Sequence, residues 1–147
     1  YGLRGEYWNV GAPLTTLAEM PTGKPEIVRV DERIDYGEDA AFKLPFADHF
    51  AARWTADLYV DADGEYEFVV GSDDGSRLTV DGQPVVENDE LHGYQEVVGK
   101  VALAPGRHSL VLTFFENEGD ARCRLLWRPP GSPRRAIVPR TRLVPGY

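Results

Sequence analysis

The feature that most constrains this chain is a series of short stretches in which apolar and polar residues alternate. In one of them Tyr66, Phe68 and Val70 occupy every second position, and the other stretches are bounded by turn residues in the same way. A period of two is typical of a β-strand with one buried face. The 15 glycines and 11 prolines are spread along the chain and interrupt longer patterns. The chain is therefore predicted to consist of many short strands.

The positions of the strands indicate the fold class. Strands are predicted at 54–60, 66–70, 77–80, 84–86, 97–103, 108–115 and 121–127, with a short closing strand at 136–139. The best helical candidate, 14–20, is short and stops at Pro21. The acidic stretch 25–48 is less regular and is expected to hold edge strands and a long loop. Short strands with frequent turns favour an all-β fold, an antiparallel β-barrel or β-sandwich with long loops at one end.

Length and charge limit the classes of partner. The 147 residues are predicted to form a single domain, 1–147. A formal net charge of -8 is a poor match for nucleic acid or an anionic membrane, and no apolar run reaches the roughly 20 residues that span a bilayer. The lone Cys123 allows no disulfide within the chain and is expected to be buried. Because the chain begins with Tyr1, we expect a piece of a longer protein whose other domains are its partners.

Two oxygen-rich turns are the strongest candidates for a binding site. Asp73 and Asp74 are adjacent in a turn between two predicted strands, and Asn117 lies in a second such turn. Neighbouring carboxylates repel each other, whereas Ca²⁺ takes six to eight oxygen ligands. If the two turns are neighbours, these side chains converge, and backbone carbonyls near Gly119 and Ala121 add ligands. Open positions on the ion are then available to water or to the hydroxyls of a sugar.

Simpler interpretations exist for both turns. Asp-Asp-Gly is also a favourable β-turn, and 116–120 fits an ordinary solvated hairpin tip. The histidines at 49, 92 and 108 are too far apart in the sequence to suggest a zinc site. No acidic pair is singled out as a catalytic acid and base, so the chain is predicted not to be an enzyme. Trp54 and Trp127 are expected in the core, while Trp8 and Tyr94 are candidates for exposure.

The motifs together resemble the protective-antigen-type (PA-fourteen) β-barrel domain. The matching stretches, in order, are 2–8, 50–54, 64–68, 72–78, 80–82, 106–108, 114–116 and 121–127, which extend over nearly the whole chain. The family usually has glycine after its Trp-Thr pair, where this chain has Ala56. Such domains occur in toxins, glycosidases, proteases and adhesins, so the resemblance alone leaves the function open.

The adhesin members of the family supply the most specific expectation. There, two adjacent aspartates joined by a cis peptide hold a Ca²⁺ ion that binds sugar hydroxyls, which implies Asp73 and Asp74 as ligands here, with Asn117 as a side-chain ligand. Glu116, Asp120 and His92 are expected to contact the bound glycan, because the loops 88–94 and 116–120 would surround the ion. The chain is thus predicted to be a Ca²⁺-dependent carbohydrate-binding module of an extracellular or cell-surface protein, such as an adhesin. The alternative is a structural or protein-interaction module without a metal.

Overall fold

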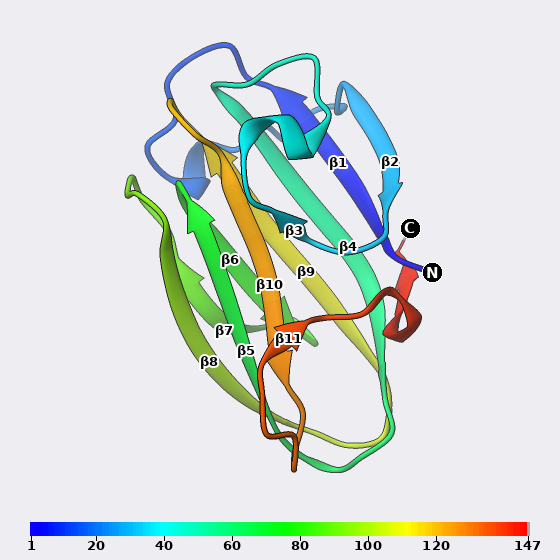
Figure 1. The fold of residues 1–147 in the computed structure, drawn as a ribbon. Helices are drawn as coiled ribbons and strands as arrows, with labels where there is room; N and C mark the ends of the chain where they lie inside the picture. The colour runs from blue at the N-terminus through cyan, green and yellow to red at the C-terminus, as the bar shows by residue number, and fades with distance from the viewer. Residues whose placement is uncertain (147) are drawn as a thin grey trace.

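Two antiparallel β-sheets enclose a common core in the computed structural model, which describes residues 1–146 (Figure 1). The larger sheet has seven strands, in the order β2 (Ile27–Asp31), β1 (Leu3–Asn9), β4 (Phe50–Val60), β9 (Gly106–Glu116), β6 (Ser76–Val80) and β7 (Gln83–Asn88), with β12 (Leu143–Pro145) also paired to β4. The smaller sheet has five, in the order β11 (Ala136–Ile137), β10 (Arg122–Arg128), β5 (Gly64–Asp73) and β8 (Gln95–Leu103), with β3 (Asp35–Tyr36) paired to β10. The predicted all-β class is confirmed, and the described residues form the sandwich.

The predicted strands are present, and several are longer than the alternation indicates. The stretch 54–60 lies within β4, which begins at Phe50 and pairs with β9 over 11 residues on each strand. The helical candidate 14–20 forms only a 3₁₀ turn, η1 (Leu17–Glu19), and two further 3₁₀ turns are η2 (Asp39–Phe42) and η3 (Arg140–Arg142). Among residues 1–146, no helix has the length and apolar character needed to cross a membrane.

Three long connections meet at the end of the sandwich where β9 terminates. The last residues of β1 and β9, Asn9 and Glu116, both pair with Phe50 at the start of β4. The segments 10–26, 37–49 and 117–121 therefore all emerge at this end, which is drawn at the top of Figure 1. The predicted placement of long loops at one end agrees with this arrangement.

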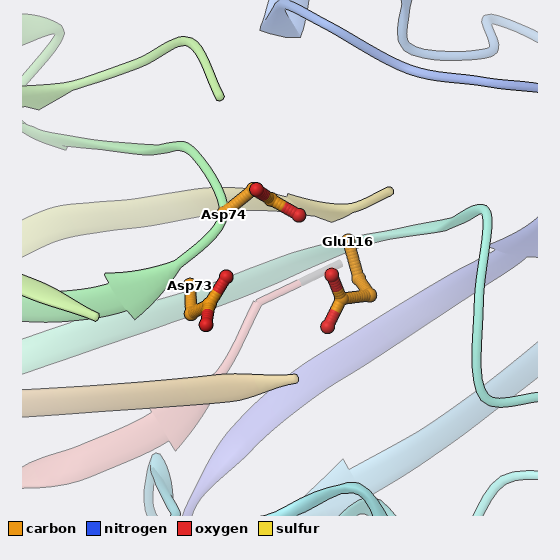
Figure 2. Close-up of side chains that lie close together, drawn as sticks. All are labelled: Asp73, Asp74 and Glu116. Carbon is orange, nitrogen blue, oxygen red and sulfur yellow. The ribbon is translucent and has the colours of Figure 1, made fainter. Parts of the chain in front are cut away.

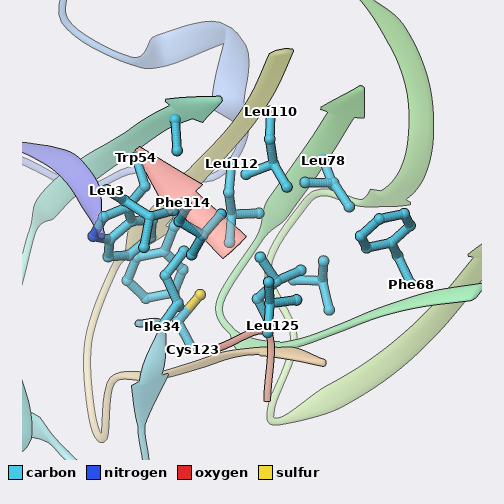
Figure 3. Packing of buried hydrophobic residues seen from close by; sticks show 14 of the residues in the cluster. Leu3, Ile34, Trp54, Phe68, Leu78, Leu110, Leu112, Phe114, Cys123 and Leu125 are labelled. Atoms are coloured by element: carbon cyan, nitrogen blue, oxygen red, sulfur yellow. The ribbon is translucent and has the colours of Figure 1, made fainter. Parts of the chain in front are cut away.

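The core between the sheets is rich in aromatic side chains (Figure 3). Trp54 is fully buried and meets the ring of Tyr7 edge to face, with centroids 5.9 Å apart. Trp127 and the free Cys123 are buried as predicted. The expectation for Trp8 is wrong, because the loop after β1 folds back over it. Trp8 belongs to a second buried cluster with Leu14, Leu17, Ala51 and Phe115.

A buried polar group within this core is fully paired. The carboxylate of Asp31 accepts hydrogen bonds from Tyr7 Oη, from Trp54 Nε1 at 2.8 Å and from Arg29 Nε at 2.8 Å. Burial, together with the nearby negative charge of Asp31, raises the pKa of Tyr7 far above its ordinary range. This network joins β1, β2 and β4, and it shows how the chain buries a charge when its role is structural.

Candidate functional site

Three carboxylates converge at the loop-bearing end of the sandwich (Figure 2). Asp73 is the last residue of β5, Asp74 follows it in the turn to β6, and Glu116 is the last residue of β9. One oxygen from each carboxylate lies within 4.8 Å of the other two. The close-up shows the three side chains pointing toward a common space from two separate chain segments.

The turn between β5 and β6 is held by its own polar groups and by the end of β9. Ser72 Oγ donates to the carbonyl of Asp74 at 2.8 Å, and the amide of Asn117 donates to Asp74 Oδ2 at 2.8 Å. Gly75 is required because a Cβ atom there would lie 2.4 Å from the ring of Phe115. The Asp73–Asp74 peptide bond is cis, as the family resemblance implies.

Glu116 is the most unusual member of the cluster. Its side chain is 0% exposed, and neither carboxylate oxygen has a hydrogen-bond partner among the described residues. Burial and the adjacent carboxylates of Asp74 and Asp73 raise the pKa of Glu116 to about 11. A buried carboxyl group without a donor is costly, and a bound cation would remove that cost by favouring the charged form.

The donor set suits a hard divalent cation. Carboxylate oxygens are the ligands that Ca²⁺ prefers, and three carboxylates would contribute up to three negative charges to its site. Burial and the charge of Asp74 also raise the pKa of Asp73, and the net shift is upward although His92 and Arg122 oppose it. The observation that points to an ion, beyond the clustering of acids itself, is the pair of unpartnered oxygens on Glu116.

The structure places Asn117 beside the cluster but uses its side chain elsewhere. Asn117 Oδ1 accepts a hydrogen bond from the amide of Leu14 at 2.9 Å, which ties the loop after β1 to the end of β9. An amide oxygen has two lone pairs, so this bond leaves one for an ion. Asn117 therefore stays a predicted ligand, while its backbone amide supports Asp74.

The remaining predicted residues lie around this centre. Gly119 adopts φ +90° at the tip of an exposed turn that includes Asp120. Ala121 is buried, and its amide donates to Asp39 Oδ1 at 2.5 Å. Both ring nitrogens of His92 are occupied by loop carbonyls, Nδ1 by Gly93 at 2.7 Å and Nε2 by Asn88 at 2.9 Å. His92 thus braces its own loop, and it lies near enough to Asp73 to oppose the rise in the pKa of that carboxyl group.

A hollow of about 490 Å³ lies between the loop after β1 and the loop after β7, lined by Thr15, Thr16, Glu90 and Leu91. The two loops are joined by Asp89, whose carboxylate accepts from Thr16 Oγ1 and from the amide of Leu17. The backbone of Glu90 also packs over Gly75, directly beside Asp74. A larger pocket of about 550 Å³ beside β2 contains none of the clustered carboxylates.

Sequence reasoning assigned Glu116 to glycan contact and did not predict it as an ion ligand. The available signal was its position in the second oxygen-rich turn, directly before Asn117. What the sequence could not indicate is that Glu116 faces inward without a donor, because that depends on the pairing of β9 with both β4 and β6.

Comparison with known proteins gives a consistent family. A family model described as PA14 domain matches residues 1–140. The anti-sigma-I factor RsgI3 of Acetivibrio thermocellus is 27% identical over 147 residues, covering 98% of this chain and 21% of that protein. A solved anti-sigma factor domain-containing protein from Clostridium clariflavum has a TM-score of 0.80 and 26% identity, covering 99% of this chain and 47% of that one.

A third similar structure is described as the PA14 sugar-binding domain from an RTX adhesin. Its TM-score is 0.82 at 24% identity, and the match covers 99% of this chain and 98% of that one. At this identity the likeness concerns the fold. The chain thus spans about a fifth of the curated relative and about half of the solved anti-sigma factor chain, whereas it matches the adhesin domain from end to end.

Proposed function

The chain belongs to the PA14 domain family, and from this premise we propose that it is a Ca²⁺-dependent carbohydrate-binding module. The observation that carries the proposal is the buried carboxylate of Glu116, whose two unpartnered oxygens face Asp73 and Asp74. A bound cation would compensate three converging carboxylates that have few donors, and hard oxygen ligands favour Ca²⁺. In this proposal Asp73, Asp74 and Glu116 hold the ion, with Asn117 as a further ligand.

The sugar would bind to coordination positions that the protein leaves open. Ca²⁺ takes six to eight oxygens, so three or four side chains leave room for two adjacent hydroxyls of a sugar. The loops 88–94 and 116–120, with Thr15 and Leu91 at the neighbouring hollow, would decide which hydroxyl pair reaches the ion. Because few atoms of a monosaccharide would be buried, its Kd is expected near millimolar. Several copies or a polyvalent glycan would raise the effective affinity.

The setting we propose is an extracellular or cell-surface part of a longer protein, with no catalytic role of its own. The support is the sugar-binding description of the RTX adhesin domain and the occurrence of this domain as a part of longer anti-sigma factor proteins. The same anti-sigma relatives favour one alternative, a module that serves regulation through protein contacts and has no metal. The two functions differ in whether Ca²⁺ binds.

A melting experiment with and without Ca²⁺ tests the proposal. A ligand that binds only the folded state adds about 2.7 kcal/mol at 100 times its Kd, so Ca²⁺ is expected to raise the Tm of the wild type above its value in chelator. Asp73→Asn should abolish this rise. Asp48→Asn, which alters an exposed carboxylate in a loop at the same end, is the matched control and should keep it.

A glycan array in Ca²⁺ and in chelator then tests the second half of the proposal. Retention of glycans only in Ca²⁺, lost in Asp73→Asn and kept in Asp48→Asn, is the expected result. An identical Tm in both buffers for the wild type would refute the metal site and favour the protein-contact module. A Ca²⁺-dependent Tm without any glycan retention would refute the sugar part alone.

A further inference from the structure

An arginine without a partner lies next to the carboxylate cluster. Arg122, the first residue of β10, is directly opposite Asp73 in the β5–β10 ladder, so the two side chains emerge on the same face of the sheet. Within residues 1–146, Arg122 forms no ion pair, and its Nε is buried without an acceptor. Its charge opposes the rise in the pKa of Asp73, which places the guanidinium within electrostatic range of the cluster.

The guanidinium of Arg122 packs on the ring of Tyr94. Its Cζ lies 3.8 Å from the ring centroid of Tyr94, which is a close cation–π contact. Tyr94 Oη donates to Glu96 Oε2 at 2.9 Å, which fixes the ring. The ring lies across β5 at Gly71, where a Cβ atom would come within 2.1 Å of Tyr94 Oη. The sequence thus leaves space at Gly71 for the ring that supports Arg122.

Other arginines of the same sheet differ from Arg122 in being paired. On the same face of β10, Arg124 Nε donates to Asp35 Oδ1 at 2.9 Å, and Arg128 pairs with Glu67 at 3.3 Å. A buried donor without an acceptor, such as Arg122 Nε, is costly, as it is for any polar group. The planar fork of N–H groups matches a carboxylate in two-point fashion. The acceptor absent from the chain is therefore expected on a ligand.

We propose that Arg122 is a specificity-determining residue that binds the carboxylate of an acidic sugar, a uronic acid, while hydroxyls of that sugar bind the ion. This inference rests on the proposed function, since the ion positions the sugar. The spacing is suitable because residues opposite each other in a ladder have Cβ atoms about 5 Å apart, which is within one sugar ring. The overall charge of -8 is not an obstacle, because charges beyond about 8 Å are screened at physiological ionic strength.

The experiment compares an acidic sugar with its neutral ester. Binding of trigalacturonic acid and of its methyl ester is measured calorimetrically in Ca²⁺, since a trimer is too short to form a gel with the ion. The wild type is expected to bind the acid about 10- to 100-fold more tightly, as charge-assisted hydrogen bonds imply. Arg122→Gln should reduce this ratio to near one. Arg128→Gln, at the far end of the same face of β10, should preserve it.

Two further variants distinguish the two-point hydrogen-bond geometry of Arg122 from its charge and from the support that Tyr94 gives it. Arg122→Lys keeps the charge but removes the two-point geometry, and it should recover only part of the ratio. Gly71→Ala should displace Tyr94 and lower the ratio without changing any charge. The Ca²⁺-induced rise in Tm should be the same in Arg122→Gln and wild type, which shows that the variant is folded and that the ion is still bound.

The outcomes distinguish this inference from the proposed function. Equal binding of acid and ester by the wild type, or an unchanged ratio in Arg122→Gln, would overturn the role of Arg122 while Ca²⁺-dependent glycan binding stands. No Ca²⁺-dependent rise in Tm in the wild type would overturn both. A third ligand, galactose 6-sulfate, identifies the anionic group: if it binds more tightly than trigalacturonic acid and depends on Arg122, the carboxylate assignment is wrong.

Discussion

Two buried carboxylates at different places in the same sandwich have opposite surroundings. Asp31, 7% exposed, accepts hydrogen bonds from Tyr7, Trp54 and Arg29 and lies against the aromatic core. Glu116, 0% exposed, has no hydrogen-bond partner within the described residues and faces two further carboxylates. Both are buried acids in strands of the larger sheet, so burial by itself does not distinguish them.

The difference in partners indicates a difference in role. A buried charge that the protein surrounds with donors contributes to the folded structure, and removing it leaves those donors unpaired. A buried acid without donors is a cost to the folded state, which protonation reduces and a bound cation would remove. The comparison therefore supports a structural role for Asp31 and the proposed binding role of Glu116, and the following predictions test each of them.

The largest expected effect is the loss of stability when the paired carboxylate, Asp31, is replaced. Asp31→Asn removes the charge that Arg29 and two other donors face, and loss of one member of a buried pair costs about 3–5 kcal/mol. Because Arg29 is partly exposed, we expect about 3 kcal/mol less free energy of unfolding, equal in Ca²⁺ and in chelator. Urea denaturation measures this. The neighbouring Glu32→Gln, which alters an exposed carboxylate, should change stability by less than about 0.5 kcal/mol. A loss below 1 kcal/mol for Asp31→Asn would contradict the structural role.

The second effect concerns the unpaired carboxyl group, Glu116, whose replacement should change stability only when Ca²⁺ is present. Glu116→Gln keeps the shape of a group that has no hydrogen-bond partner, so the stability in chelator should stay within about 1 kcal/mol of wild type. At 100 times the wild-type Kd, the stabilisation of about 2.7 kcal/mol by Ca²⁺ should be lost. Melting curves of the wild type and of Glu116→Gln, each in Ca²⁺ and in chelator, measure these stabilities. A variant that still gains the full Ca²⁺ stabilisation would show that Glu116 does not hold the ion.

The smallest effect concerns an exposed pair that serves as a reference for the two buried acids. His108 Nδ1 faces Asp81 Oδ2 at 2.6 Å, and Nε2 faces the carbonyl of Ala104 at 2.7 Å. Partial burial lowers the pKa of His108, but this carbonyl and Asp81 outweigh it and raise the pKa above its ordinary value. The pKa of Asp81 is lowered by its hydrogen bond with His108.

The sign of the pH dependence follows from these two shifts. The contribution of His108 is complete below its ordinary pKa of about 6.5 and is lost as the pH rises through its raised pKa in the folded state. The contribution of Asp81 is present above about pH 3.9. Wild type should therefore exceed His108→Gln in stability by less than about 1 kcal/mol at pH 6, and by less still at pH 8.5. Unfolding curves at both pH values measure this, and a larger advantage at pH 8.5 would contradict the assignment.

The strands were the most predictable part of the molecule, because alternation and turn residues are local signals. Asp81-Gly82 does lie between β6 and β7, and the acidic stretch 25–48 does contain the edge strands β2 and β3. Neither β1 (Leu3–Asn9) nor the last strand (Leu143–Pro145) was predicted, and the three residues of the last strand carry no periodicity. The last strand pairs with β4, where Leu143 lies opposite Leu58. Trp8 was expected to be exposed because its burial also has no local signal. Its cluster includes Ala51 and Phe115, which are distant from it in the sequence.

By itself, the sequence determined the all-β class, the turns and the adjacent pair of aspartates, because each depends on residues close together along the chain. The tertiary structure decided what surrounds that pair. It brought Glu116 to Asp74 across more than 40 residues, directed Asn117 Oδ1 to the amide of Leu14, and left Arg122 stacked on Tyr94 without an acceptor. The physical reason is that whether a buried polar group has a partner depends on which strands pair, and pairing between distant segments leaves no local signal in the sequence.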